Sequence, residues 1–284
     1  MAVVENRTID KQEPFSTVVG DPWARVLAAG AMQGRVLHAI MLREVKSRFG
    51  RQKLGFLWAV FEPMALVAVF ALLFAMGHET SPSGMPVVPF MITGFAPFIL
   101  FRSAMTQTMQ AIEANRQLLI FSQVTPTDLV LARGLLEVAT LTVVFFLLIA
   151  GAYALGFETR IENPLQMLFA LGCLAMTGCG LGAFFAALIP FVRSIKQFVS
   201  IFAGRPLFFI SGLFFTFEML PGNVREILLF NPIMHMIEWL RSAVFIQFES
   251  RYASLDYAVG TAIFTLFIGL LMLRGLRRRL LANL

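Results

Sequence analysis

Four charged residues lie inside long apolar stretches of this 284-residue chain and are the first candidates for chemistry: Glu62, Arg102, Glu137 and Arg205. At about 1.5 Å of helix rise per residue, all four lie at a similar depth, roughly 12–15 Å from one end of each stretch. Charges at such depth are costly and normally pair or face water. Two interpretations stay open. One is a structural clamp of acid–arginine pairs; the other is a polar path, where arginine suits the oxygens of an anionic cargo.

Phenylalanine is the second conspicuous residue type, with 30 in the chain. Four of them, Phe208, Phe209, Phe214 and Phe215, lie near the end of one apolar stretch. Aromatic rings pack well against lipid and neighbouring helices, which is one interpretation. The other is an aromatic lining along which sugar rings could slide.

Sequence motifs of soluble enzymes are missing, because the chain contains neither GxxxxGK[ST] nor HExxH. His235 and Glu238 are three residues apart on one helical face, a spacing that can hold a metal. No second half of such a site is visible, so helix packing or an interfacial hydrogen bond is the competing interpretation. Cys173 and Cys179 would point to opposite helix faces and are interpreted as packing residues. We therefore expect no cofactor and no covalent chemistry in this chain.

The elements that position these residues follow from composition. Apolar residues make up 58% of the chain and charged residues only 14%, against about 25% charged in soluble proteins. Apolar runs of roughly 20 residues, long enough to cross a bilayer, recur along the sequence. The prediction is an all-α, polytopic membrane protein. Its six expected spans are 55–77, 87–112, 128–155, 164–190, 197–216 and 257–273, preceded by a cytoplasmic tail over 1–34 without a secretory signal.

Basic residues predict the orientation. Arg43, Lys46, Arg48 and Arg51 precede the first span, and an arginine-rich RGLRRRL ends the chain. Lys and Arg mark the cytoplasmic side, so both termini are expected there. The sequence pI of about 9.9 is then a sign of topology and gives no reason to expect nucleic-acid binding.

Two connections are expected to form structure outside the spans. The cytoplasmic connection 113–126 predicts a short amphipathic helix, either lying among lipid headgroups or docking into a cleft of a cytoplasmic partner. Its polar and apolar residues are Glu113, Asn115, Arg116, Leu118, Leu119 and Phe121. The outer segment 217–248 predicts two short helices packed on the outer rim. Gly178 and Gly182 predict close helix packing in the fourth span.

The order of these parts resembles the permease subunit of ABC-2 type exporters, specifically the capsular polysaccharide export permeases. The resemblance covers roughly residues 35–280. It rests on REVKSRFGRQKLGFLWAVFEP, NRQLLIFSQVTP and FNPIMHMIEWLRSAVF.

This resemblance implies an ABC-2, or type V, exporter fold that works as a homodimer with two separate ATP-binding subunits, which bind ATP and magnesium. It implies an interface helix over 35–50 with Arg43 and Arg48, and a coupling helix over 113–126. It also implies outer gate helices over 217–248, whose candidate residues are Pro221, Asn231, Pro232, His235, Glu238 and Arg241. The polymer path would lie between protomers near Glu62, Arg102 and Arg205, leaving Glu137 as a structural partner.

The expected function is that of a non-catalytic permease in the cytoplasmic (inner) membrane, moving a lipid-linked, acidic capsular polysaccharide outward. The expected further partners are a periplasmic polysaccharide co-polymerase or adaptor and an outer-membrane exporter. Export of O-antigen or teichoic acid is the alternative within the same class. A membrane enzyme acting on lipid-linked sugars, which would need convergent carboxylates or a histidine site, and a self-contained secondary transporter are alternatives from other classes.

Overall fold

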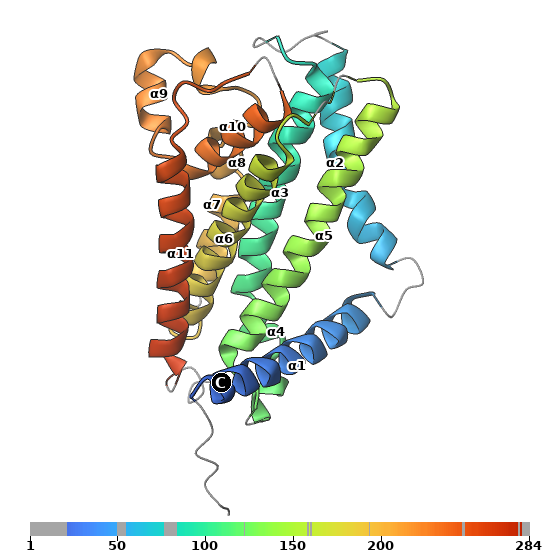
Figure 1. Ribbon diagram of the computed structural model, residues 1–284. Coiled ribbons are helices and arrows are strands. Elements are labelled where there is room, and N and C mark those ends of the chain that lie inside the picture. The colour runs from blue at the N-terminus through green and yellow to red at the C-terminus, as the bar shows by residue number, and fades with distance from the viewer. Residues whose placement is uncertain are drawn as a thin grey trace, which may run out of the picture. The chain divides into compact units, whose positions relative to one another are not determined.

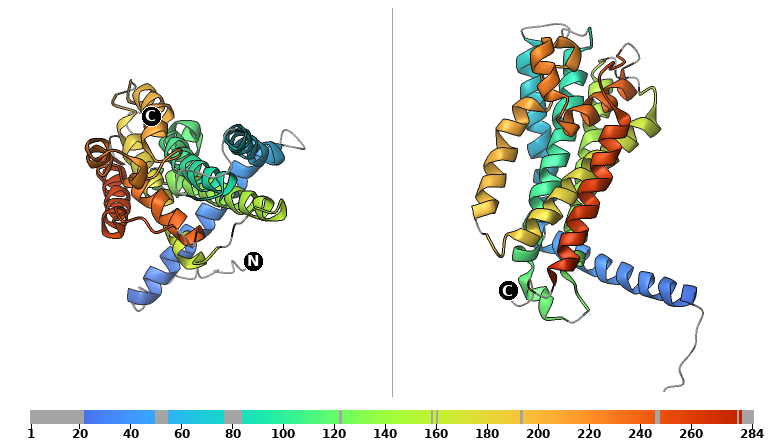
Figure 2. Two further views of the ribbon diagram at one scale, coloured as in Figure 1. Left: turned by 90° about the horizontal axis from the view of Figure 1, so that it is seen from above. Right: turned by 90° about the vertical axis from the view of Figure 1, so that its left-hand side faces the viewer.

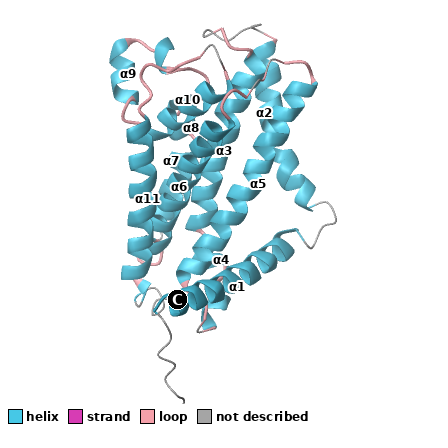
Figure 3. Ribbon diagram, viewed as in Figure 1, coloured by secondary structure: helices cyan, strands magenta, loops and turns pink. Residues whose placement is uncertain are grey.

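The computed structural model describes residues 22–49, 55–76, 84–121, 123–157, 159, 161–192, 194–245, 248–277 and 279. These residues form helices and turns, with no strand among them (Figure 3). The long helices are α1 (Pro22–Phe49), α2 (Gly55–Ala75), α3 (Val87–Met109), α5 (Pro126–Ala154), α6 (Pro164–Leu188) and α11 (Leu255–Gly275). The shorter ones are α4 (Ala111–Ala114), α7 (Ser194–Gly204), α8 (Pro206–Ile210), α9 (Gly222–Leu228) and α10 (Pro232–Val244), with 3-10 turns at Arg116–Ile120 and Phe217–Met219 (Figure 1).

The chain divides into two compact units, residues 1–35 and residues 36–284. The described part of the first unit is the beginning of α1, which starts at Pro22. The expected helix over 35–50 therefore begins 13 residues earlier than predicted, inside the segment 1–34 that was expected to be a tail. Proline is favoured in the first turn of a helix, and the alanine-rich residues that follow are strong helix formers.

Four helices in the second unit are long and apolar enough to cross a membrane by length and composition: α3, α5, α6 and α11. They run side by side (Figure 1, Figure 2). Within α2, the residues whose side chains the structure describes include the apolar stretch Phe61–Phe74. Five expected spans thus each fall on one helix. The count of six membrane crossings stays a prediction.

The expected span over 197–216 is not one helix. α7 ends at Gly204, Arg205 has φ −117° and ψ −61°, and α8 starts at Pro206. Proline has no backbone N–H to continue a helix, and it disfavours the helical conformation of the residue before it. After α8 the chain is irregular from 211 to 216, with Gly212 at φ 74°. The break places Arg205 between two helices.

Glycines on α6 bring three membrane helices into backbone contact. A Cβ on Gly178 would lie 2.5 Å from the Phe101 carbonyl oxygen of α3, and one on Gly182 would lie 2.5 Å from that of Met105. On the α11 side, a Cβ on Gly180 would lie 2.4 Å from the Leu266 nitrogen. The predicted close packing at Gly178 and Gly182 is confirmed.

The connection over 113–126 also differs from its prediction. In place of one helix over 113–126, the structure has α4, a 3-10 turn and an irregular stretch before α5. A capping box starts α5: the Thr125 hydroxyl accepts from the Asp128 N–H, while the Asp128 carboxylate accepts from the Thr125 N–H. This cap ends the connection at Thr125, and the helix is interrupted at Asn115, whose φ is −118° and whose side chain bonds to α1. The outer segment over 217–248 does form two short helices, α9 and α10.

Candidate functional site

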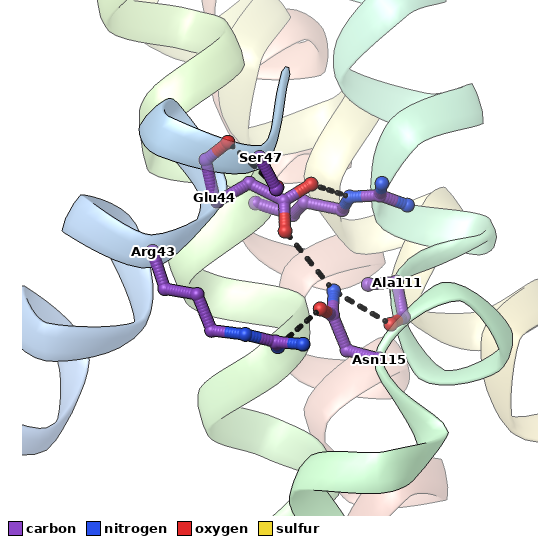
Figure 4. A network of polar contacts seen from close by, with 6 residues as sticks. Arg43, Glu44, Ser47, Ala111 and Asn115 are labelled. Atoms are coloured by element: carbon purple, nitrogen blue, oxygen red, sulfur yellow. Dashed lines mark hydrogen bonds and ion pairs between the residues drawn. The ribbon is translucent and has the colours of Figure 1, made fainter. Parts of the chain in front are cut away.

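Four polar side chains from three segments meet at the end of the bundle that the sequence predicts to be cytoplasmic (Figure 4). Arg43 Nη1 donates to Asn115 Oδ1 at 3.1 Å, and Asn115 Nδ2 donates to Glu44 Oε2 at 3.2 Å. Arg133 Nε donates to Glu44 Oε1 at 2.7 Å. Arg43, Glu44, Asn115 and Arg133 are called the polar joint below. They connect α1, the segment after α4 and the first turns of α5.

The polar joint stabilises the contact between its segments because its central residues are buried. Glu44 and Asn115 are each only 5% exposed, and buried polar groups need partners to offset their desolvation. Asn115 can serve both neighbours because its amide carries an acceptor and two donors. Beside the joint, Ile40 of α1 packs with Leu129 and Ala132 of α5. Residues 36–47 of α1 are therefore held to the 111–120 segment and to α5 together.

The structure places the predicted coupling residues as follows. Arg43 and Asn115 lie in the polar joint, whereas Glu113 pairs with Lys196 of α7 at 2.7 Å on the surface. Leu118 and Leu119 are half-buried, Arg116 is exposed, and the Arg48 side chain lies outside the described residues. Sequence reasoning missed Glu44 and Arg133. The available signal was that Glu44 is the single acid in the basic stretch 43–53.

An open groove lies beside the polar joint. It has a volume of about 460 Å³ and is lined by Val36, Ala39, Ile40 and Arg43 of α1 and by Leu118, Phe121, Gln123 and Val124. Phe121 is 62% exposed and the neighbouring Ile120 is 84% exposed. An apolar groove with one arginine at its edge, next to exposed large apolar side chains, is suited to docking a helix or loop of another protein.

The four charges within the apolar stretches are distributed unevenly. Glu62, Arg102 and Arg205 are exposed, while Glu137 on α5 is buried. The ion pairs that the structure describes join Glu44 to Arg133 and Glu113 to Lys196. Mutual pairing among the four stays a prediction. Exposure of Glu62, Arg102 and Arg205 is a feature that a path along the surface of this chain would need.

Three of the four predicted phenylalanines join one aromatic cluster between α2, α3 and α8. Phe208 contacts Phe98 with ring centroids 5.7 Å apart, and Phe214 contacts Phe95 at 5.2 Å. Phe209 contacts Phe208 at 5.3 Å and is itself 61% exposed. Phe215 packs elsewhere, in an apolar cluster with Phe217, Leu228 and Met234. Packing explains Phe208 and Phe214, and among these four Phe209 has the most exposed ring.

At the opposite end of the bundle, which the sequence predicts to be the outer one, side chains at the start of α10 and within it bind the irregular segment that follows α8. Arg241 Nη1 donates to the Phe215 carbonyl at 3.2 Å, and Nη2 donates to the Leu213 carbonyl at 3.1 Å. The guanidinium also lies 3.9 Å from the centroid of the Phe90 ring. Glu238 accepts from the Phe217 N–H and from the Ser250 hydroxyl. Asn231 Nδ2 donates to the Ile210 carbonyl at 2.8 Å. Asn231, Glu238 and Arg241 are called the outer clamp below.

The outer clamp is more deeply buried than the polar joint, since Glu238 and Arg241 are both fully buried. Desolvation raises the pKa of Glu238 to about 7, despite its two hydrogen bonds, which act in the opposite direction. The predicted Pro232 is the first residue of α10, directly after Asn231, whose Oδ1 accepts from the Ile233 N–H. Pro221 is exposed, immediately before α9.

His235 is fixed as a neutral ring. Its Nδ1 accepts from the Ser254 N–H at 2.9 Å, so the proton is on Nε2, which lies 2.8 Å from the Leu229 carbonyl. Burial lowers the pKa of His235. Both ring nitrogens take part in hydrogen bonds, as the hydrogen-bond interpretation of His235 expects. No group of metal-ligating side chains occurs among the residues that the structure describes.

Comparison with known proteins shows the family to which the chain belongs. The model of the ABC-2 type transporter family matches residues 35–245. The polysialic acid transport protein KpsM of Escherichia coli is 34% identical over 254 residues, covering 89% of this chain and 97% of that protein. The capsule polysaccharide export inner-membrane protein BexB of Haemophilus influenzae is 29% identical, covering 86% and 92%. The O-antigen export system permease protein RfbA of Klebsiella pneumoniae is 26% identical, covering 86% and 93%.

Proposed function

Because the chain belongs to the ABC-2 type transporter family, we propose that it is the permease subunit of an exporter that moves capsule polysaccharide outward across the inner membrane. The observation that carries the proposal is similarity over nearly the whole length of relatives named for capsule polysaccharide or polysialic acid transport. The several apolar helices suit a multi-pass protein of that membrane. The cargo is a lipid-linked, acidic polysaccharide.

Energy for export comes from a separate ATP-binding subunit, which binds ATP and magnesium. The absence of a P-loop motif from the sequence supports this division of labour. The groove beside the polar joint, with Ile120 and Phe121 exposed next to it, offers a docking surface on the cytoplasmic face. The permease acts as a homodimer with two copies of that subunit, and both of its termini are cytoplasmic.

The polar joint transmits motion from the ATP-binding subunit. The 111–120 segment follows directly from the end of α3, and Arg133 belongs to α5, so both helices meet at the joint. A push on the docking groove therefore displaces the cytoplasmic ends of α1, α3 and α5 together. The chain does no covalent chemistry in this scheme; it only changes the alignment of its helices.

The path for the polymer lies at the homodimer interface, along the exposed charges Glu62, Arg102 and Arg205. Arginine forks match carboxylate and phosphate oxygens, which fits an acidic cargo. Phe209 is the exposed member of the aromatic cluster, and its ring is available to contact sugars of the polymer. The outer helices α9 and α10, held to the end of α8 by the outer clamp, form the exit, where a periplasmic adaptor and an outer-membrane exporter receive the polymer.

O-antigen export is the closest competing function, because RfbA is also similar. Its identity of 26% against 34% for KpsM favours the capsule. Teichoic acid export has no specific support. A membrane enzyme acting on lipid-linked sugars is disfavoured because His235 is committed to two structural hydrogen bonds.

Deletion of the gene in its own organism tests the proposed function. Capsule polymer should accumulate in the cytosol and disappear from the cell surface, and the full chain supplied in trans should restore it. If the polymer is never made, the chain takes part in synthesis and the proposal is wrong. If capsule is normal but O-antigen is retained inside the cell, the competing cargo is correct.

A further inference from the structure

The helices α6 and α11 touch at one end and separate toward the other. At the level of Gly180 their backbones are in contact, because a Cβ there would lie 2.4 Å from Leu266. Two turns earlier on α6, a Cβ on Gly172 would meet nothing within 4 Å. The two helices therefore open like a wedge toward their N-terminal ends, and the missing side chain of Gly172 deepens the opening.

This wedge forms a groove of about 460 Å³. Its walls are α6, with Leu168, Phe169 and Met176, and α11, with Val259 and Ile263, and every residue that lines it is apolar. Phe169 and Ile263 are 50% and 56% exposed, so the groove is open along its length. Its α6 residues lie on a different face of the helix from Gly178 and Gly182, the glycines that contact α3.

The chemistry and width of the groove exclude water and a helix as its occupant. Water needs two to four polar partners and finds none on an apolar lining. A transmembrane helix is about 10 Å across, so it could cover the mouth of the groove but could not enter it between α6 and α11. Leu165 and Met176 are separated by roughly 16 Å of helix rise, which matches half of a hydrocarbon core of about 30 Å. An empty groove would forfeit dispersion contacts along both walls.

We propose that this groove holds one acyl chain of a membrane phospholipid, from the leaflet that surrounds the N-terminal ends of α6 and α11. The bound chain fills the wedge and stabilises the contact of the two helices. This inference depends on the membrane location of the chain and not on the cargo of the proposed exporter.

Trp239 of α10 is a natural reporter for the groove. Its ring packs edge-on against Phe169 of the groove wall, with centroids 5.4 Å apart. α10 is fixed to α6 there, since Gln166 Nε2 donates to the Trp239 carbonyl at 3.1 Å and to the Ser242 hydroxyl at 2.8 Å. A heavy atom on an acyl chain in the groove would therefore lie close to a fixed indole.

The experiment measures quenching of Trp239 fluorescence in vesicles of phosphatidylcholine brominated on its acyl chains. Trp23 and Trp58 are replaced by phenylalanine in the full-length protein. Gly172→Leu fills the groove, while Gly151→Leu adds the same side chain to an exposed position of α5 that has open space. We expect Gly172→Leu to make quenching at least about twofold weaker, with Gly151→Leu equal to the parent.

Equal quenching in the parent and in Gly172→Leu would overturn the proposal. So would an absence of quenching in the parent, since these vesicles contain phospholipid alone and no cargo lipid. If Gly172→Leu does not fold, Val259→Phe fills the groove from the opposite wall and is read in the same way. As a second readout, native mass spectrometry should show phospholipid retained by the parent and by Gly151→Leu, and lost from the groove-filling variant.

Discussion

The polar joint and the outer clamp both hold an irregular segment with buried charged side chains, but they do it differently. In the joint, the bonds between segments join side chains: Arg43, Asn115, Glu44 and Arg133 form one chain of contacts, and Asn115 also donates to the Ala111 carbonyl of its own segment. In the clamp, the bonds are mainly to backbone: Arg241 and Glu238 bind carbonyls and an N–H of the 213–217 segment, and Glu238 also accepts from the Ser250 hydroxyl. Side-chain pairs can exchange partners when helices shift, whereas bonds to backbone groups fix one conformation of a segment. The joint is therefore suited to transmitting motion, and the clamp to preventing it.

The depth of burial sharpens this contrast. Arg133 keeps 16% of its side chain exposed in the joint, while Arg241 in the clamp is fully buried. A buried charge that loses its partners costs several kcal/mol, but a partly solvated one is re-hydrated at small cost. The outer clamp also has no spare space beside it, because a Cβ on Gly94 of α3 would lie 2.7 Å from Arg241 Nη2.

Arg241→Met should have the largest effect on stability. It removes the hydrogen bonds to the fully buried Leu213 and the half-buried Phe215, whose carbonyls lose their charged donor, and we expect a loss of about 3 kcal/mol or more. Thermal unfolding of the purified chain in detergent measures the loss. Arg225→Met is the matched control, because Arg225 is half-buried against the Tyr252 ring and should shift the melting temperature little. Equal shifts in the two variants would mean that the outer clamp has no special role.

Asn115→Asp should separate stability from function in the polar joint. The aspartate cannot donate to Glu44 and repels it, so α1 loses its connection to the 111–120 segment at one point. Asn115 is only 5% exposed, so a carboxylate beside Glu44 should cost about 3 kcal/mol, partly offset by its contact with Arg43; in the molecules that stay folded, export should still fall at least about tenfold through the lost mechanical connection. The measurements are the melting temperature and surface capsule.

Gln117→Glu adds the same charge two residues away at an exposed position and should leave both quantities unchanged. Normal export by Asn115→Asp would contradict the role of the joint in transmission.

Acidification should reveal two opposing titrations at the outer helices. The folded pKa of His235 is lowered, so its contribution is present above the unfolded pKa of about 6.5 and is lost as pH falls below it. The folded pKa of Glu238 is raised to about 7, so its contribution runs the other way, and stability rises as pH falls from about 7 toward 4.5. The isosteric Glu238→Gln removes the second titration. Its melting temperature should fall more steeply between pH 7.5 and 5.5 than that of the parent; parallel curves would contradict this assignment.

Glu113→Gln should have the smallest effect. The Glu113–Lys196 pair is 43% exposed on both sides, and surface pairs contribute about 0–1 kcal/mol. We expect no measurable change in melting temperature or export, in contrast to Asn115→Asp two residues away. A loss of export in Glu113→Gln with an intact fold would extend the joint to α7.

Apolar length alone predicted the helices α3, α5, α6 and α11, since crossing a bilayer sets a minimum run that few other structures share. It failed at α7 and α8, where the composition is equally apolar but Pro206 cannot continue the backbone hydrogen bonds. In the 113–126 connection, the Thr125–Asp128 capping box is readable in the sequence and marks where α5 begins, but no sequence signal marks the break at Asn115.

In the polar joint and the outer clamp, the sequence likewise predicted some residues and not their partners. Arg43 and Asn115 could be predicted from their segments, but their neighbours Glu44 and Arg133 are separated by 89 positions, a distance that no spacing rule covers. Glu238 and Arg241 were identified as part of the outer segment, while their partners are backbone atoms, which carry no sequence signature. Sequence patterns therefore locate charged side chains well and locate the backbone groups they bind poorly.

Reconstitution tests the central claim most directly. Inverted vesicles should contain the full chain with or without the ATP-binding subunit from the same organism, and lipid-linked capsule polysaccharide should be added outside. We predict ATP-dependent protection of the polymer from added glycosidase only when both subunits are present, and no protection with Asn115→Asp in place of the parent chain. Transport or chemical modification of the polymer by the lone chain would contradict the account.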